Sequence, residues 1–101
     1  MEARMFREAI SSLFADTPDA IILYDRDGVV VGANAAAQTL GGYAVGEMTG
    51  TTFRDHVAPR DVERVELAVN TALAGGTDHF DTSARHKDGS TIPVECYVFA
   101  A

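Results

Sequence analysis

Two residue types in this sequence could do chemistry at a built site: one cysteine, Cys96, and three histidines, His56, His79 and His86. A lone cysteine cannot form an internal disulfide. The histidines have no spacing that would bring them together within one helix or strand, whereas a closed metal site needs four ligands in tetrahedral reach. The serines lack a Gly-x-Ser-x-Gly turn and a histidine–acid pair at a suggestive spacing. We therefore expect no protein-only metal site and no enzyme activity from this chain.

Acidic side chains outnumber basic ones by fifteen to eight, which gives a formal net charge of −7. Asp25, Asp27 and Asp88 are explained by turns, because aspartate side chains hydrogen-bond the backbone of tight turns. An acidic chain repels a phosphate backbone, so nucleic acid is excluded as a partner. No apolar run approaches the ~20 residues that cross a bilayer, and no secretion signal is present. We expect a cytoplasmic location without direct membrane contact.

The elements that must position these residues fit into one domain, because 101 residues with 47% hydrophobic content can bury one core but not two. Residues 1–16 are expected to form an N-terminal amphipathic helix that precedes the domain at 17–101. Apolar residues within 2–14 share one face at helical spacing: Phe6, Ala9, Ile10, Leu13 and Phe14. An exposed apolar stripe needs a partner. The helix is therefore expected to cover the sheet, form a dimer contact or continue a signalling helix from a longer parent chain.

A first hairpin is predicted between Asp19 and Asn34. Ala20 to Tyr24 and Val29 to Val31 are two apolar runs rich in β-branched residues, and Asp25-Arg26-Asp27-Gly28 between them is typical of a bulged hairpin turn. The first run is apolar without alternation, which favours an interior strand with other strands on both sides.

Helices follow the first hairpin. Asn34 is a strong helix N-cap for a short helix over 35–40, which Gly41-Gly42 ends. Tyr43 to Thr52 is expected to contain a single helical turn. Pro59 to Leu73 is the long helix, and we expect its apolar stripe to pack across the sheet. That stripe is Val62, Val65, Val69, Ala72 and Leu73.

A second, longer hairpin is predicted from Asp78 onward, where the apolar period changes to two. Its turn is Lys87-Asp88-Gly89-Ser90. Ile92, Val94, Cys96 and Val98 alternate with polar or outward positions on the second strand, and the residues expected to face inward are Phe80, Thr82 and Ala84 on one strand and Val94, Cys96 and Val98 on the other. The fold class is therefore α+β, with helices on one face of an antiparallel sheet.

The chain resembles the PAS sensor domain in a series of short fragments that run in the family's order across residues 17–99. They are Asp19-Ala20-Ile21 leading into Asp25-x-Asp-Gly28, Val31-x-x-Asn34-x-Ala36, Gly42-Tyr43-x-x-Gly46-Glu47-x-x-Gly50, His56-x-x-Pro59-x-Asp61, and Lys87-Asp88-Gly89-x-x-Ile92-Pro93-Val94-Glu95. No single fragment is diagnostic, but their order and spacing together make the resemblance strong.

The resemblance implies a five-stranded antiparallel sheet in spatial order 2-1-5-4-3, and the sequence supplies four of these strands. The fifth would lie between the first and fourth strands, so its absence leaves two strand edges unpaired. We expect a fragment of a longer protein, or a position filled by a segment of another copy or of the N-terminal helix region. Direct pairing of the first and fourth strands stays open. The expectation that matters most is that both hairpins share one curved layer covered by the long helix.

The resemblance also implies a sensing module that borrows its chemistry from a cofactor when it has one. Flavin-binding members use a cysteine in the loop before the long helix, but residues 50–54 contain none. Haem-binding members use a histidine of the long helix, and residues 59–74 contain none. His56 is expected to order its loop or cap the helix start, and Cys96 to be a small core residue. The sequence thus argues against a flavin–thiol adduct and against haem, and it leaves the cofactor unknown.

A pocket between the long helix and the sheet is the site hypothesis. Its candidate lining is Ile22, Tyr24, Phe53, Val65, Val69, Phe80, Thr82, Val94 and Cys96. Such a lining suits a small hydrophobic ligand or, with slight preference, a filled core. The function expected is a signal-sensing and interaction module of a larger signalling protein, such as a sensor kinase of a two-component system. The alternative is a ligand-free dimerisation scaffold, and a homodimer through residues 2–14 or strand exchange is expected alongside an effector domain.

Overall fold

The protein is described by a computed structural model that covers residues 14–100. The elements in chain order are β1 (Ile22–Tyr24), β2 (Val30–Ala33), α2 (Ala35–Gly41), α3 (Val45–Met48), the 3₁₀ helices η1 (Phe53–His56) and η2 (Pro59–Asp61), α4 (Val62–Leu73), β3 (Thr77–Arg85) and β4 (Thr91–Phe99). Phe14 to Asp16 form a helical turn, and the rest of the predicted N-terminal helix lies outside the described residues. Within that range, no helix is both long and apolar enough to cross a membrane.

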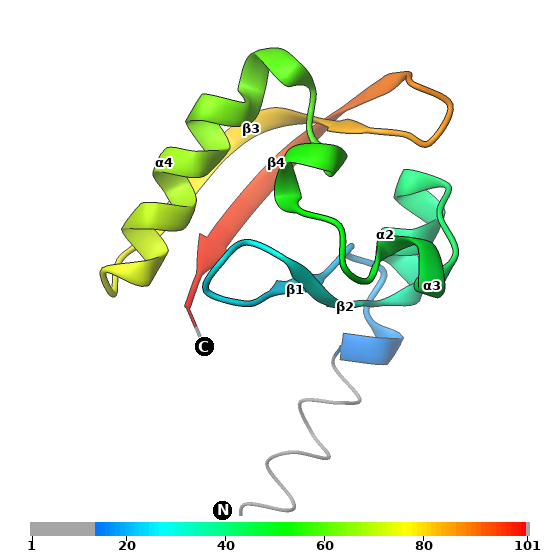
Figure 1. Cartoon of the computed structure of the whole chain (residues 1–101), viewed down its shortest axis with the longest axis horizontal. Helices are drawn as coiled ribbons and strands as arrows, with labels where there is room; N and C mark the ends of the chain where they lie inside the picture. The colour runs from blue at the N-terminus through cyan, green and yellow to red at the C-terminus, as the bar shows by residue number, and fades with distance from the viewer. Residues whose placement is uncertain (1–13, 101) are drawn as a thin grey trace, which may run out of the picture.

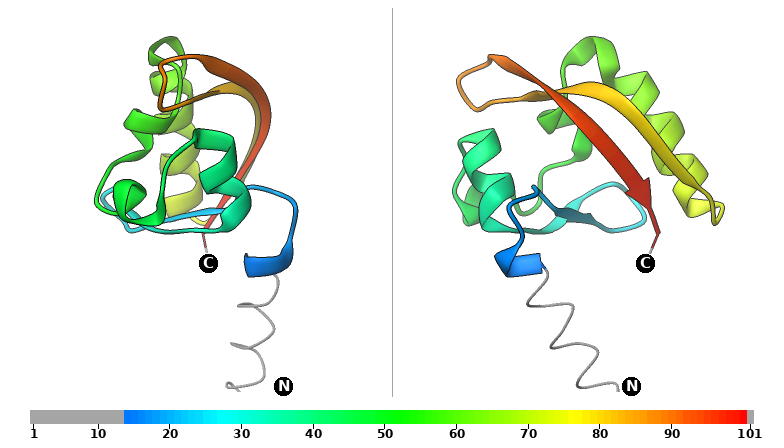
Figure 2. Two further views of the ribbon diagram at one scale, coloured as in Figure 1. Left: turned by 90° about the vertical axis from the view of Figure 1, so that its right-hand side faces the viewer. Right: turned by 180° about the vertical axis from the view of Figure 1, so that it is seen from behind.

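The two predicted hairpins form, but they do not share one layer. β1 pairs only with β2, and β3 pairs only with β4, each antiparallel, so the described chain has two two-stranded sheets. The longer hairpin crosses above the shorter one, with α4 along the former and α2 and α3 beside the latter (Figures 1 and 2). The expectation of a single curved layer was wrong, because β1 and β4 make no backbone bonds to each other. The expectation of unpaired edges on these two strands is confirmed within residues 14–100.

The first hairpin turn has the chemistry that its sequence predicts. The Asp25 carboxylate accepts hydrogen bonds from the backbone N–H groups of Asp27 (2.9 Å) and Val29 (3.0 Å), and the strand register shifts between Leu23 and Tyr24. Gly28 has φ of 78°, and a side-chain carbon there would lie 2.8 Å from the Phe53 ring. Both backbone conformation and space therefore require glycine at this position.

Residues 50–58, which we call the linking segment, hydrogen-bond to both hairpins. The Val30 N–H of β2 donates to the Thr51 carbonyl (2.7 Å). At the other end of the segment, the Ala58 N–H donates to the Ser83 carbonyl of β3 (2.9 Å). Isolated bridges at both places mark short stretches of strand-like pairing. The segment thus connects the outer edge of β2 to the outer edge of β3.

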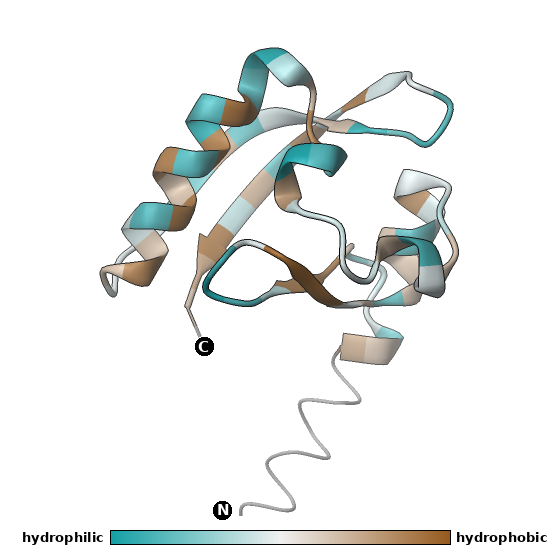
Figure 3. Cartoon of the chain, viewed as in Figure 1, coloured by the Kyte–Doolittle hydropathy of each residue, from teal (hydrophilic) through white to brown (hydrophobic). Residues whose placement is uncertain are grey.

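Helix α4 packs on β3 and β4, and its chain begins as 3₁₀ turn η2 rather than as α-helix at Pro59. Figure 3 shows apolar and polar residues alternating around α4. Val65, Ala68 and Ala72 are buried, whereas Leu73 is 52% exposed. The predicted stripe was therefore wrong at Leu73, where the helix extends past the core, and it omitted Ala68, which is fully buried. Small residues at 68 and 72 let the helix approach the hairpin closely.

Arg64 fixes α4 to β3. Its guanidinium donates two hydrogen bonds to the Asp78 carboxylate (2.7 and 3.0 Å) and lies 4.1 Å from the centre of the Phe80 ring. This pair holds the pKa of Asp78 below its usual range, chiefly through the hydrogen bonds from Arg64. Asp61 adds a second tie, because its carboxylate accepts from the Thr82 hydroxyl (3.2 Å) and the Ser83 N–H (3.1 Å).

Asn34 joins the start of β1 to the start of α2, as its predicted N-cap role requires. Its Oδ1 accepts hydrogen bonds from the N–H groups of Ala37 (3.0 Å) and Ile21 (2.9 Å), while its Nδ2 donates to the Asp19 carbonyl (2.9 Å). The residue is only 3% exposed. Truncation would leave buried backbone groups without partners, which is costly.

Replacing Asn34 with alanine should lower the free energy of unfolding by about 2–4 kcal/mol, because a buried N-cap hydrogen bond and two part-buried hydrogen bonds are lost together. Asn34→Asp, which keeps the acceptor but not the Nδ2 donor, should lose less. Urea denaturation followed by circular dichroism measures both. Thr39→Ala, at an exposed position of α2, is the matched control, and a loss for Asn34→Ala no larger than the control's would contradict the role assigned to this amide.

Candidate functional site

The inner face of the β3–β4 hairpin forms one wall of the candidate site. Burial alternates along both strands except at the buried Ser83, with even-numbered residues turned toward α4. Phe80 pairs with Cys96 across the strands, and Thr82 pairs with Val94. All four are half-buried, so the predicted alternation is confirmed.

Phe53 and Val65 lie deeper than the hairpin wall and are almost fully buried, at 4% and 5% exposure. The Phe53 ring meets the Tyr24 ring edge to face, with centroids 6.3 Å apart, and Arg54 lies 4.6 Å from its centroid. Phe53 therefore connects the linking segment to the first hairpin. Val69 is half-buried on α4, the helix that packs on the hairpin wall.

Tyr24 reaches from the first hairpin toward the second. Although 37% of the residue is exposed, burial of its hydroxyl raises the pKa of Tyr24, and the Cys96 sulfur adds to this shift. Burial likewise raises the pKa of the Cys96 thiol, which disfavours a reactive thiolate. No residue between 14 and 100 hydrogen-bonds the Tyr24 hydroxyl. Ile22 is half-buried and pairs with Ala33 in the first hairpin.

His56 lies inside the linking segment and is 7% exposed. The Thr51 hydroxyl donates its single proton to the Met48 carbonyl (2.5 Å), so the His56 Nε2, 2.6 Å from that hydroxyl oxygen, carries a proton and donates to it. The Tyr43 ring packs edge to face on the imidazole, with centroids 5.3 Å apart. Burial lowers the pKa of His56, partly offset by Asp55. The prediction that His56 orders its loop is confirmed.

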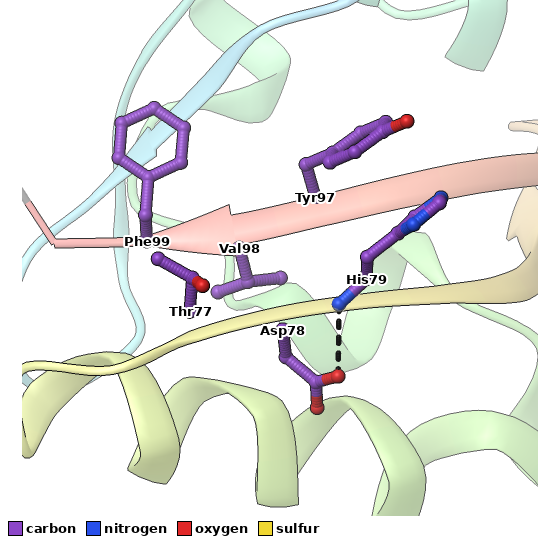
Figure 4. Close-up of a pocket in the computed structure, with 6 residues that line it drawn as sticks. All are labelled: Thr77, Asp78, His79, Tyr97, Val98 and Phe99. Atoms are coloured by element: carbon purple, nitrogen blue, oxygen red, sulfur yellow. Dashed lines mark hydrogen bonds between the residues drawn. The ribbon is translucent and has the colours of Figure 1, made fainter.

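Sequence reasoning missed a groove at the open end of the second hairpin, where Thr77 pairs with Phe99. It has a volume of about 600 Å³ and is lined by Thr77, Asp78, His79, Tyr97, Val98 and Phe99 (Figure 4). Strand alternation did place Tyr97 outward, and two exposed aromatic residues at i and i+2 are the signal that could have found this groove. In the part of the chain that the structure describes, no cluster of His, Cys, Asp and Glu could hold a metal ion.

Comparisons with known proteins agree on one fold. A family model described as "PAS fold" matches residues 14–101. The PAS domain of a protein from Colwellia psychrerythraea is 25% identical, with a TM-score of 0.79 over 89% of this chain and 77% of that chain. A domain of a sensory box sensor histidine kinase/response regulator from Geobacter sulfurreducens is 18% identical, with a TM-score of 0.87 over 99% of this chain and 88% of that chain. At the latter identity the likeness shows the fold alone.

A light-oxygen-voltage domain studied with a flavin analogue is also similar. It is 27% identical, with a TM-score of 0.60 over 72% of this chain and 55% of that chain. A search of curated proteins gave no significant match.

Phe53→Ala should lower the free energy of unfolding by about 3–5 kcal/mol, because truncating a buried phenylalanine loses its burial and leaves a cavity. Leu67→Ala is the matched control, since Leu67 is 60% exposed on α4. Denaturant titration of both variants is the measurement. Equal losses for the two would show that Phe53 does not support the core.

The free energy of unfolding should fall as the pH drops below about 6.5, the ordinary pKa of histidine. Above that pH, His56 is neutral in both states. Below it, the unfolded chain takes up a proton that the buried imidazole resists, so stability is lost until the folded histidine also protonates.

Denaturant titrations at a series of pH values between about 5 and 8 measure this dependence. His56→Gln should flatten it, whatever the variant's absolute stability. If His56→Gln keeps the wild-type pH dependence of the free energy of unfolding, titrating groups other than His56 cause that dependence.

Proposed function

The chain belongs to the PAS fold family, and from this premise we propose that it is a signal-sensing and protein-interaction module of a larger signalling protein. Its structural neighbours include a domain of a sensory box sensor histidine kinase/response regulator and a PAS domain from a two-component sensor histidine kinase. We further propose that it binds a small hydrophobic ligand between α4 and the inner face of the β3–β4 hairpin. No catalytic role is proposed for this segment.

The observation that carries the ligand proposal is the Tyr24 hydroxyl. The hydroxyl is shielded enough for its pKa to be raised, although 37% of the residue is exposed, and none of the described residues hydrogen-bonds it. A polar group that leaves water without a partner costs free energy until it finds one. Cys96 is close enough to influence the pKa of Tyr24, and the half-buried Phe80, Val94 and Cys96 supply apolar surface on the inner face of the β3–β4 hairpin. A small apolar molecule with one hydrogen-bond acceptor would match both features.

The residues near the long helix do not fit a thiol-bound flavin or haem, the two cofactors that members of the family hold there. The loop before α4 has no cysteine, and the Cys96 thiol, on β4, has a raised pKa. Residues 59–74 hold no histidine, and the His56 Nε2 donates to the Thr51 hydroxyl. The proposed ligand is therefore neither a thiol-bound flavin nor haem.

The proposed mechanism is a change in how the two hairpins and α4 pack. A ligand that contacts Tyr24 on β1 and Cys96 on β4 bridges two sheets that share no backbone bonds. Binding would favour one relative packing over another, since a ligand shifts an equilibrium toward the state it binds better. The segment predicted as an N-terminal helix, or chain beyond β4, would pass this preference to an effector domain in the cytoplasm.

Native mass spectrometry of the freshly purified protein tests the ligand proposal. We expect an additional mass that is released on denaturation. Tyr24→Phe should retain about fivefold less of it, because one neutral hydrogen bond is lost. Tyr43→Phe, which removes a hydroxyl from the ring packed on His56, should retain the wild-type amount.

The second candidate function is a ligand-free dimerisation scaffold, which the unpaired edges of β1 and β4 favour. It predicts a protein without bound small molecules that sediments as a dimer in analytical ultracentrifugation. That result would overturn the ligand proposal and leave the family assignment unaffected.

A further inference from the structure

The linking segment is closed by a chain of hydrogen bonds around one histidine. His56 is 7% exposed, and its Nε2 donates to the Thr51 hydroxyl (2.6 Å), which in turn donates to the Met48 carbonyl of α3 (2.5 Å). The Tyr43 ring packs edge to face on the imidazole. A single titratable side chain therefore ties two positions of the segment to each other and to α3.

His56 lies between the two places where the segment contacts the hairpins. On one side, the Thr51 carbonyl accepts a hydrogen bond from the Val30 N–H of β2 (2.7 Å). On the other side, the Ala58 N–H donates to the Ser83 carbonyl of β3 (2.9 Å). Figure 1 shows this green stretch of chain running from the first hairpin to the second. A change at the imidazole therefore acts on both attachments.

The surroundings of His56 are unfavourable for a positive charge. Among the described residues, the charged group that acts on His56 is Asp55, and its carboxylate already accepts a backbone hydrogen bond at the start of η1. Beyond the Tyr43 ring, Lys87 lies 6.0 Å from the ring centre and is paired with Glu47. No hydrogen bond within residues 14–100 involves the His56 Nδ1, so a proton added there finds no protein acceptor. Burial outweighs Asp55 and lowers the pKa of His56.

We propose that uptake of a proton by His56 opens the linking segment and uncouples the two hairpins, which gives the domain a response to pH. A buried imidazolium without a free counter-charge is stabilised when its segment opens to water. The β3–β4 hairpin keeps its own strand pairing and the packing of α4 when the segment opens. The open state therefore changes how the hairpins sit relative to each other and leaves the larger one intact.

The size of the response follows from proton linkage. In the open segment, His56 has the ordinary pKa of histidine, about 6.5, whereas in the closed segment it resists protonation. The ratio of open to closed segment should therefore rise about tenfold between pH ~7.5 and pH ~5.5. The response needs no ligand in the interior, so its failure would leave the ligand proposal standing.

Amide hydrogen exchange of the wild-type protein, followed by NMR at pH ~7.5 and pH ~5.5, measures opening of the segment. After correction for the intrinsic pH dependence of amide exchange, protection of the Val30 and Ala58 amides should fall about tenfold at the lower pH. At both pH values it should stay below that of the most protected amides of β3 and β4, because the segment opens without unfolding of the whole domain.

His56→Gln removes the titrating group and keeps an amide N–H that can donate to the Thr51 hydroxyl. Protection of the Val30 and Ala58 amides should then be the same at both pH values. His79→Gln, the same change at an exposed histidine of β3, is the matched control and should keep the tenfold fall. In the wild type, the His56 ring resonances should titrate with the same midpoint as the Val30 and Ala58 amide shifts, which tests the coupling without a variant.

Three outcomes would overturn the proposal. The first is protection at Val30 and Ala58 that does not change with pH. The second is protection equal to that of the most protected amides of β3 and β4, because the segment would then open only when the domain unfolds. The third is a fall in protection that persists in His56→Gln or disappears in His79→Gln, because another group would then be the sensor.

Discussion

The two hairpins depend on the linking segment, because they share no backbone hydrogen bond. Residues 50–58 bond to β2 at one end and to β3 at the other. The shape of the segment depends in turn on its interior, where His56 donates to Thr51 and Phe53 packs against Tyr24. The side chains of Thr51, Phe53 and His56, which the sequence alone would assign to a loop, therefore determine how the two sheets sit relative to each other. The candidate ligand site lies between parts that this segment holds together.

Local features could be predicted from the sequence because their causes are local. The Asp25–Gly28 turn, the Asn34 cap and the alternation of Phe80, Thr82 and Val94 each follow from a few neighbouring residues. The single layer could not be settled in the same way, since the pairing of β1 with β4 depends on chain segments far apart. Leu73 was misplaced for a related reason. Helical periodicity gives the face of a residue but not whether the helix still lies over the core at that point.

The burial of several residues in the candidate lining could be predicted from the sequence. Phe53 and Val65 are buried as the hypothesis requires, and Tyr24 reaches Cys96 across the two hairpins. The unpartnered state of the Tyr24 hydroxyl could not be seen in the sequence, because a hydrogen-bond partner can come from anywhere in the fold. The Arg64–Asp78 pair was missed likewise. Arginine and aspartate on a helix and a strand are usually solvated, and only their placement shows that they fix α4 to β3.

The position of the linking segment in the chain has a consequence for folding kinetics. Each hairpin joins strands that are neighbours in sequence, so each can form with a small loss of loop entropy. The segment that connects them must then dock on two surfaces at once. Its hydrogen bond to β3 joins Ala58 to Ser83, about 25 positions apart in the sequence. Docking of this middle stretch, rather than formation of either ribbon, is therefore the step expected to limit the refolding rate.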